Sequence, residues 1–295
     1  ITLLGVSAKF IDSVSSAGLR PIETHDLKTL RTICSTGSPL SPESFTHVYE
    51  RWKEDVHLAS ISGGTDLCGC LVGGNPDKPV FAGQIQGPIL GQDIDVLNDD
   101  GSSVDVGVQG ELVCKSAFPS MPIGFWNDPE DIRYKSTYFE KFPGLWHQGD
   151  FAEKTAAGGF IIHGRSDATL NPGGVRIGTS EIYRRVDLFD EILESLAVGQ
   201  SWMGDVRIIL FVVVADGFLF DDSLANRLRQ SIRDGASPRH VPAVILNVPD
   251  LPRTRSGKLV ELAVKNVIEG LPVSNVESLA NPEALDYFKN FPELD

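Results

Sequence analysis

Two apolar runs, each ending in a loop of glycines and small hydroxyl residues, set the strongest limit on how this chain folds. The first, "LRTICSTG" (30–37), runs into "STGSPLSPES" (35–44), and the second, "VHLASISGG" (56–64), runs into "SISGGTDLCG" (60–69). Between them Ser41 is a typical helix cap, followed by Pro42 and Glu43 at preferred positions of a first turn. Strand, helix and strand in this order predict part of a parallel sheet, with both loops at its carboxyl edge.

Such loops let backbone N–H groups approach a ligand closely, and the usual ligand is a phosphate or a carboxylate. Two ordinary turns are the simpler interpretation of the same residues.

The rest of the chain has other patterns of predicted secondary structure. From about 80 to 165, short strands and turns, with "NDDGSS" as a hairpin tip, predict a small β-barrel or a distorted sheet. Beyond 167, a helix at "GTSEIYRRV", capped by Thr179 or Ser180, is followed by strands and two more helices, the first ending at Gly235. We therefore expect an α/β protein with a large domain over 1–166 (sheet segment 1–79, β-barrel-like part 80–166) and a small α+β domain over 167–295.

Charge and cysteine usage narrow the class of protein. Forty acidic against 26 basic residues give a net charge of −14, which argues against a nucleic-acid partner or an anionic membrane surface. The longest apolar run, "IILFVVVA" (208–215), fits a buried strand and is too short for membrane insertion. The cysteines have neither disulfide-framework nor zinc-site spacing, which favours reduced thiols in the cytoplasm: Cys34, Cys68, Cys70 and Cys114.

Two short motifs in the first domain carry chemistry. "SGGTD" (62–66) places the Thr65 hydroxyl beside the Asp66 carboxylate after a strand, a pairing that suits Mg²⁺ with its phosphate. "WHQGD" (146–150) sets Asp150 just past a glycine, where it can accept hydrogen bonds from ribose hydroxyls. Asp150 as a plain turn residue is the alternative.

Two further motifs belong to the second domain. "GRSDATLNPGGVRIGTSEIY" (164–183) holds Arg165, Asp167 and Arg176 around a Gly-rich turn. "PRTRSGK" (252–258) presents Lys258 on a flexible loop that has two arginines. A local Arg165–Asp167 ion pair and a solvated basic loop are the alternatives.

Together these motifs resemble the adenylate-forming superfamily of acyl-CoA synthetases, luciferases and peptide-synthetase adenylation domains. Within it, "STGSPLSPE", "SISGGTD", "FPSMPIGFWNDP" and "GRSDATLNPGGVRIGTSEIY" are most similar to acetoacetyl-CoA synthetases. The resemblance covers nearly the whole chain. Nothing here matches the family's Ser/Thr/Gly-rich phosphate loop, so we expect a fragment that lacks the N-terminal part of its own large domain and has the complete small domain.

The resemblance implies ATP and coenzyme A as cosubstrates, with Mg²⁺. It assigns to the nucleotide Gly37, Ser38, Pro39, Ser62, Gly63, Gly64, Thr65, Asp150, Arg165 and Arg176. Asp66, where the family usually has the longer Glu, would hold the metal. The catalytic residues implied are Lys258, Thr65 and Arg176.

Further roles follow from the same resemblance. Gly174 and Arg233 are implied to lie near coenzyme A, and Asp167 to be the hinge about which the small domain turns. Gly63 and Gly64 would leave room in the acyl pocket for acetoacetate. The alternative is that these glycines serve only the backbone geometry of the loop.

The activity implied is that of an acetoacetate–CoA ligase that works through an acyl-adenylate and releases pyrophosphate and AMP. Positioning and charge neutralisation dominate such phosphoryl chemistry, which suits Lys, Arg and Mg²⁺. Two other possibilities stay open: a synthetase for acetate or propionate, and a non-catalytic remnant that binds nucleotide.

Overall fold

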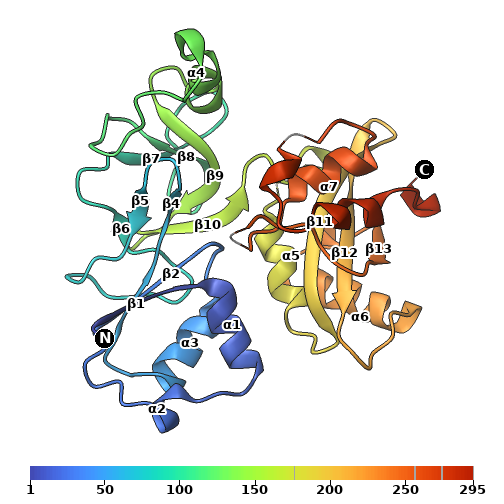
Figure 1. The fold of residues 1–295 in the computed structure, drawn as a ribbon, viewed down its shortest axis with the longest axis horizontal. Helices are drawn as coiled ribbons and strands as arrows, with labels where there is room; N and C mark the ends of the chain where they lie inside the picture. Colours follow the sequence, from blue (N-terminus) through green and yellow to red (C-terminus); the bar gives the residue numbers. More distant parts are fainter. Residues whose placement is uncertain (176, 256, 274, 295) are drawn as a thin grey trace. The chain divides into compact units, whose positions relative to one another are not determined.

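The chain forms two compact units, Ile1–His163 and Gly164–Asp295 (Figure 1). The computed structural model describes residues 1–175, 177–255, 257–273 and 275–294. The division falls between His163 and Gly164, whereas the predicted boundary falls between 166 and 167, and the hinge at Asp167 stays a prediction.

A parallel sheet opens the first unit, as the strand–helix–strand pattern predicted. Its strands are β1 (Leu3–Ser7), β2 (Thr32–Thr36) and β3 (His57–Ser60), in the order β1-β2-β3. The connections contain α1 (Ala8–Ser16), the short α2 (Pro21–Thr24) and α3 (Pro42–Arg51). Ser41 caps α3 as predicted, since its hydroxyl accepts a hydrogen bond from the Ser44 amide. Helices α1 and α3 lie side by side and share one apolar core with the sheet.

The second apolar run continues differently from the prediction. Ser62–Gly64 was expected to be loop, but these residues form a strand, β4, which pairs antiparallel with β5 (Gly69–Gly73). Strand β5 pairs in turn with β6 (Gly87–Pro88). The loop is therefore only a tight turn at 65–68 between β4 and β5. The chain changes sheets at Ile61.

The predicted β-barrel is wrong, because the strands of this region form open sheets. The larger one has the order β10-β9-β8-β7, from β7 (Ile94–Leu97), β8 (Gln109–Cys114), β9 (Trp146–Lys154) and β10 (Phe160–Arg165). The hairpin tip at "NDDGSS" is confirmed, since β7 and β8 pair antiparallel across it. A 3₁₀ turn (Pro129–Asp131) and α4 (Ile132–Tyr138) precede β9, and α4 packs on it.

The second unit is the predicted α+β layer structure. Its sheet has the order β11-β12-β13, from β11 (Ile192–Trp202), β12 (Asp205–Val214) and β13 (Val244–Asn247). Strand β12 pairs antiparallel with β11 and parallel with β13. Its side chains alternate between two apolar cores, with Ile208 and Leu210 in one and Ile209 and Phe211 in the other. The run "IILFVVVA" is thus a strand buried on both faces, as expected.

Helices cover both faces of this sheet. The helices α5 (Thr179–Val186) and α6 (Asp222–Gly235) contribute to one core, and α7 (Glu261–Ile268) to the other. The predicted cap of α5 is wrong: Gly178 is the N-cap, and Thr179 and Ser180 lie buried inside the first turn. Short 3₁₀ turns complete the unit at Pro172–Gly174, Pro238–His240, Val276–Ser278, Pro282–Phe288 and Pro292–Leu294.

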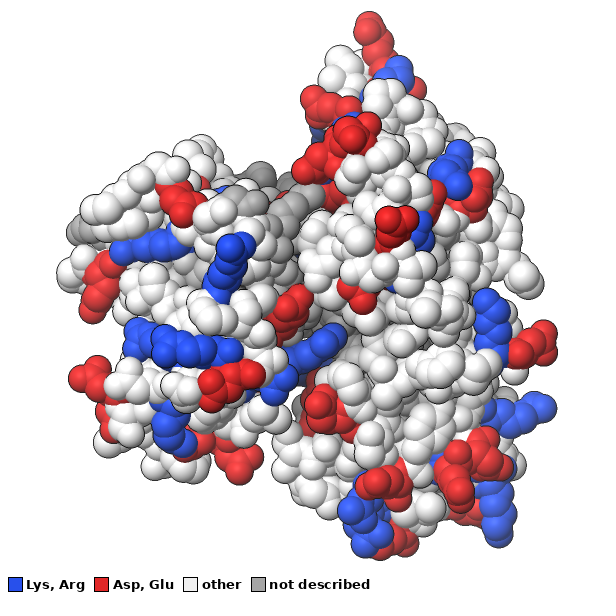
Figure 2. Space-filling model, turned by 180° about the vertical axis from the view of Figure 1, so that it is seen from behind, with Lys and Arg blue, Asp and Glu red and all other residues white. Residues whose placement is uncertain are grey.

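The remaining bulk predictions concern charge, thiols and membranes. On the face in Figure 2, basic and acidic side chains are interspersed over both units, with no broad basic surface. All four cysteines are free thiols. Over the part of the chain that the structure describes, no helix combines the length and apolarity needed to cross a bilayer.

Candidate functional site

The two small-residue segments meet at the end of the parallel sheet. The amide of Ile61 donates a hydrogen bond to the carbonyl of Ser35 at 2.9 Å, which joins the end of β3 to the end of β2. Gly37 and Ser38 are exposed just beyond β2, and Pro39 is half-buried. Gly37 has φ of +93°, a conformation that favours glycine. An exposed backbone of this kind at a sheet edge can be approached closely by a planar ligand.

The glycines of β4 differ in what surrounds them. A Cβ on Gly63 would lie 2.0 Å from the carbonyl oxygen of Gly69 and 2.5 Å from the Cα of Cys70. Strand β5 therefore excludes any side chain at Gly63, whatever the ligand. A Cβ on Gly64 would be 3.2 Å from Oε1 of Gln148, which is a side-chain atom and not backbone. Only Gly64 can carry the predicted selection by pocket size.

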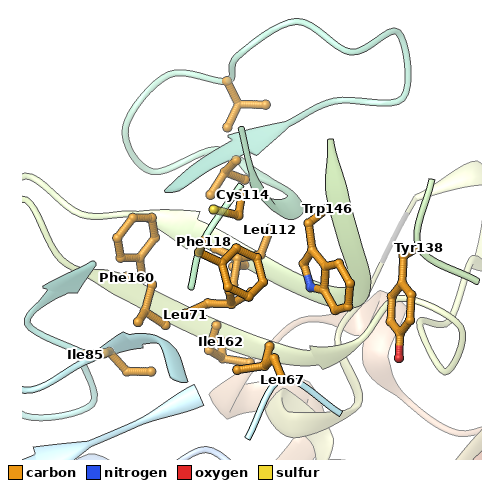
Figure 3. Packing of buried hydrophobic residues seen from close by; sticks show 14 of the residues in the cluster. Leu67, Leu71, Ile85, Leu112, Cys114, Phe118, Tyr138, Trp146, Phe160 and Ile162 are labelled. Carbon is orange, nitrogen blue, oxygen red and sulfur yellow. The ribbon is translucent and has the colours of Figure 1, made fainter. Parts of the chain in front are cut away.

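Thr65 and Asp66 are exposed on the turn after β4, as a ligand pair requires. The hydroxyl of Tyr138, the last residue of α4, donates a hydrogen bond to Oδ2 of Asp66. The Tyr138 ring stacks on Trp146, with centroids 3.8 Å apart and planes 15° apart (Figure 3). Tyr138 is 72 residues from Asp66 in the chain, and no local sequence signal connects the two.

Asp150 lies in β9 and is only 7% exposed. Its Oδ2 accepts a hydrogen bond of 2.8 Å from the side-chain amide of Gln148. The Gln148 oxygen accepts in turn from the indole N–H of Trp146 at 3.3 Å. Gly149 between them has φ of +81°. Asp150 is thus an oriented carboxylate in a strand, and the alternative of a plain turn residue does not hold.

In the second unit, Arg165 and Asp167 form a two-pronged ion pair. The guanidinium approaches Oδ1 at 3.4 Å and Oδ2 at 3.2 Å, and both side chains are about half exposed (48% and 46%). The local-pair interpretation is therefore correct as far as it goes. Pairs this exposed contribute about 0–1 kcal/mol, so either side chain can exchange its partner for a ligand at low cost.

Lys258 follows a tight turn that holds its backbone. The Thr254 hydroxyl accepts a hydrogen bond of 3.1 Å from the Lys258 amide, and the Thr254 amide donates one of 2.8 Å to the Lys258 carbonyl. Arg253, by contrast, is occupied by Glu194 at 2.9 Å and by Asp250 at 2.5 Å. Among the residues that the structure describes, the exposed Lys258 ammonium has no ion-pair partner. The loop is therefore not uniformly solvated, because Arg253 is held by ion pairs whereas the Lys258 ammonium is exposed to solvent.

The other predicted residues of the second unit lie on separate elements. Gly174 ends the 3₁₀ turn Pro172–Gly174, in which the Gly173 amide donates to the carboxylate of Asp205 at 2.9 Å. Arg233 is exposed in the last turn of α6. Arg176 lies outside the described residues.

A half-buried pair that the sequence did not indicate, Tyr183 and Glu261, lies near Asp167. The Tyr183 hydroxyl donates to Oε1 of Glu261 at 3.1 Å and accepts from the amide of Ala197 at 3.1 Å. Burial raises the pKa of Glu261, and the nearby Asp167 raises it further while Arg165 lowers it. The pKa of Tyr183 is also raised, mainly by burial and next by Glu261.

Asp66 is compatible with magnesium in one way only. No cluster of three or more His, Cys, Asp or Glu side chains could hold a metal within the described ranges. Mg²⁺ usually binds one or two carboxylates and takes its other ligands from phosphates and water. An exposed single carboxylate beside a hydroxyl fits an ion that arrives with a nucleotide.

Comparisons with known proteins identify a matching family model and similar sequences. Residues 2–123 match the family model described as AMP-binding enzyme. The acetoacetyl-coenzyme A synthetase of Rhizobium meliloti (strain 1021) is 59% identical over 292 residues, which are 99% of this chain and 45% of that protein. The acetoacetyl-CoA synthetase of Xenopus tropicalis is 48% identical over 100% of this chain and 44% of its own length.

Solved structures give the same result for the fold. The acetoacetyl-CoA synthetase from Streptomyces lividans has a TM-score of 0.90 and 39% identity, over 98% of this chain and 44% of that one. A benzoate CoA ligase from Burkholderia xenovorans LB400, at 22% identity over 90% of this chain and 51% of its own, has a TM-score of 0.72. The chain spans less than half the length of the curated relatives it matches.

Proposed function

Because residues 2–123 match the model of AMP-binding enzymes and nearly the whole chain is similar to acetoacetyl-CoA synthetases, we propose that the chain belongs to the adenylate-forming enzymes and forms part of an ATP-dependent acetoacetate–CoA ligase. The observation that carries the proposal is the 59% identity to an acetoacetyl-coenzyme A synthetase over nearly the whole chain. The TM-score of 0.90 to a second such enzyme supports it.

The proposed reaction has two steps whose atoms balance without oxidation or reduction. In the first, a carboxylate oxygen of acetoacetate attacks the α-phosphorus of ATP, a P–O bond forms, and pyrophosphate leaves with the broken Pα–O bond. In the second, the thiol sulfur of coenzyme A attacks the acyl carbon, AMP leaves, and the thiol proton is released. Both steps develop negative charge on phosphate oxygens, so cations and oriented donors govern the rate.

In the first unit, the exposed backbone of Gly37, with Ser38 and Pro39, is proposed to contact the adenine. Asp150 would accept from the ribose hydroxyls. Ser62, Gly64 and Thr65 would face the acyl group and the α-phosphate. Asp66 would hold Mg²⁺, which when bound neutralises phosphate charge.

In the second unit, Arg165 and Arg176 are proposed to contact ribose or phosphate, and Gly174 and Arg233 to lie near coenzyme A. Lys258 would supply the charge that completes adenylation. Since Lys258 is needed only in the first step, the second unit must move between steps, with Asp167 as the proposed hinge.

A chimera tests the proposal. In it, residues 1–295 of this chain replace the matching segment of the Rhizobium meliloti relative. AMP formation is measured with acetoacetate, acetate, propionate and butyrate, in the presence of coenzyme A. We expect acetoacetate to give the highest kcat/KM. A higher value for acetate or propionate would establish the alternative synthetase, and AMP binding without turnover would indicate a non-catalytic nucleotide-binding module.

We also propose that the protein works in the cytoplasm, which the four free thiols support. Cell fractionation with an antibody to this chain checks the compartment.

A further inference from the structure

Two candidate ligand carboxylates of the first unit are held by side chains to which no role has been assigned. We propose that Tyr138 and Gln148, joined through Trp146, form a positioning device that fixes the carboxylates of Asp66 and Asp150. The inference rests on the proposed function, since it treats these carboxylates as ligands of the metal and the ribose. Tyr138, Gln148 and Trp146 act through the carboxylates and are not catalytic residues.

Two hydrogen bonds determine which end of the Gln148 amide faces Trp146 and which faces Asp150. The indole N–H of Trp146 can only donate, so the atom of Gln148 that it meets at 3.3 Å is the oxygen. The amide nitrogen of Gln148 then points to Oδ2 of Asp150, 2.8 Å away, which can only accept when ionised. The hydrogen bond from the indole therefore fixes the orientation of the Gln148 amide, and that amide in turn orients the carboxylate of Asp150.

The Tyr138 branch begins from the other side of the same indole. Trp146 is 1% exposed and Tyr138 4% exposed, and their rings are stacked. A packed ring cannot follow a moving partner, so its hydroxyl is a fixed donor. Asp66 is exposed on a turn and would otherwise sample several rotamers. Its hydrogen bond from Tyr138 selects one of them.

Neutral donors suit this purpose better than cations do. A phenol or an amide orients a carboxylate and leaves its negative charge available, whereas Lys or Arg would neutralise the charge that a metal ion needs. Partners that orient a ligand commonly change metal affinity or activity by about 10–100-fold when they are removed. The side chains of the two carboxylates lose their conformational freedom during folding, so this entropy loss does not weaken ligand binding.

The test measures two independent quantities in the chimera. The first is the dissociation constant of AMP by calorimetry without metal, and the second is the Mg²⁺ concentration that gives half-maximal adenylation. We expect Gln148→Met to weaken AMP binding about tenfold and to leave the Mg²⁺ requirement unchanged. Tyr138→Phe should raise the Mg²⁺ requirement about tenfold, lower the calorimetric affinity for MgATP, and leave AMP binding unchanged.

Trp146→Phe keeps an aromatic surface for Tyr138 and removes the indole N–H, so it should behave like Gln148→Met. Tyr134→Phe is the matched control. The Tyr134 hydroxyl donates to the carbonyl of Pro122 and belongs to the same aromatic cluster, but it contacts neither carboxylate. We expect it to change thermal stability alone.

The inference is overturned if Gln148→Met and Tyr138→Phe each shift AMP binding and the Mg²⁺ requirement in the same proportion. It is also overturned if these two variants behave like the control Tyr134→Phe. AMP calorimetry needs no acyl substrate. A chimera that prefers another acid therefore counts against the proposed function and leaves the positioning device testable.

Discussion

At the scale of single residues, the clearest contrast lies within one loop. Arg253 is bound by two carboxylates, whereas Lys258, five positions later, is exposed at the end of a turn that Thr254 holds. A basic loop that served only solubility would not need one anchored cation beside one presented cation. The arrangement suits a lysine that must reach a ligand and then withdraw.

Replacing Lys258 by Ala in the chimera should separate the two half-reactions. We expect adenylation to fall by about 10²–10³, which corresponds to about 3–4 kcal/mol of transition-state stabilisation. Thioester formation from supplied acetoacetyl-adenylate should persist. Pyrophosphate release and thioester yield measure the two steps, and an equal fall in both would refute the role of Lys258.

The two glycines of β4 should differ in how much stability a substitution costs. Gly63→Ala places a methyl group against the backbone of β5, so we expect a loss of at least about 1–3 kcal/mol in the free energy of unfolding of the first unit. Gly64→Ala displaces only the end of Gln148 and should cost far less. Urea unfolding, followed by tryptophan fluorescence, measures both.

Selection of the acyl group is then tested at Gly64 alone. Gly64→Trp should lower kcat/KM for acetoacetate much more than for acetate, because an added ring excludes the longer acid first. An equal fall for both acids would show that this glycine, like Gly63, serves the backbone.

Glu261 should make stability depend on pH. Its pKa in the folded protein is raised by burial above the ordinary value of 4.5, so the fold favours the protonated form. The stability this contributes is fully present below the unfolded pKa and is lost as pH rises through the folded pKa. Glu261→Gln cannot ionise, and we expect its unfolding free energy to gain on that of the wild type over this window. Chemical denaturation at a series of pH values measures the difference; parallel curves would contradict the assignment.

At the scale of elements, the sequence predicted the features that depend on a few neighbouring residues. The cap at Ser41 and the strand–helix–strand pattern around α3 were readable because caps and apolar runs act over a few residues. Strand β4 was not, since Ser62–Gly64 has a loop-like composition and becomes a strand only through pairing with β5. The open sheets were mistaken for a barrel because closure depends on which edge strands meet, and the sequence of each strand is silent on that.

The candidate site shows the same division. Asp66 and Asp150 stand in recognisable motifs, but the donors that orient them do not share a motif. Tyr138 reaches Asp66 from a helix far along the chain, and Glu261 meets Tyr183 across 78 positions. Residues that act by position in space leave no periodic signal in the sequence, so only the fold could reveal them.

At the scale of the whole molecule, each unit has its own apolar cores. Clusters around Trp146 and Phe45 belong to the first unit, and those around Leu228 and Phe211 to the second. We expect scanning calorimetry of the chain to resolve two unfolding transitions. Leu228→Ala, which empties a buried site on α6, should lower one melting temperature and leave the other in place. A single transition that shifts as a whole would show that the units unfold together.

Strand β12 has a consequence for how the second unit opens. It is the central strand of its sheet, and its residues from Ile208 to Val212 are buried in cores on both faces. We therefore expect neither fraying of an edge nor local opening to expose those amides to deuterium. Their exchange therefore reports opening of the entire unit, and the five amides should exchange together, last of all in their unit, at a rate set by its global stability.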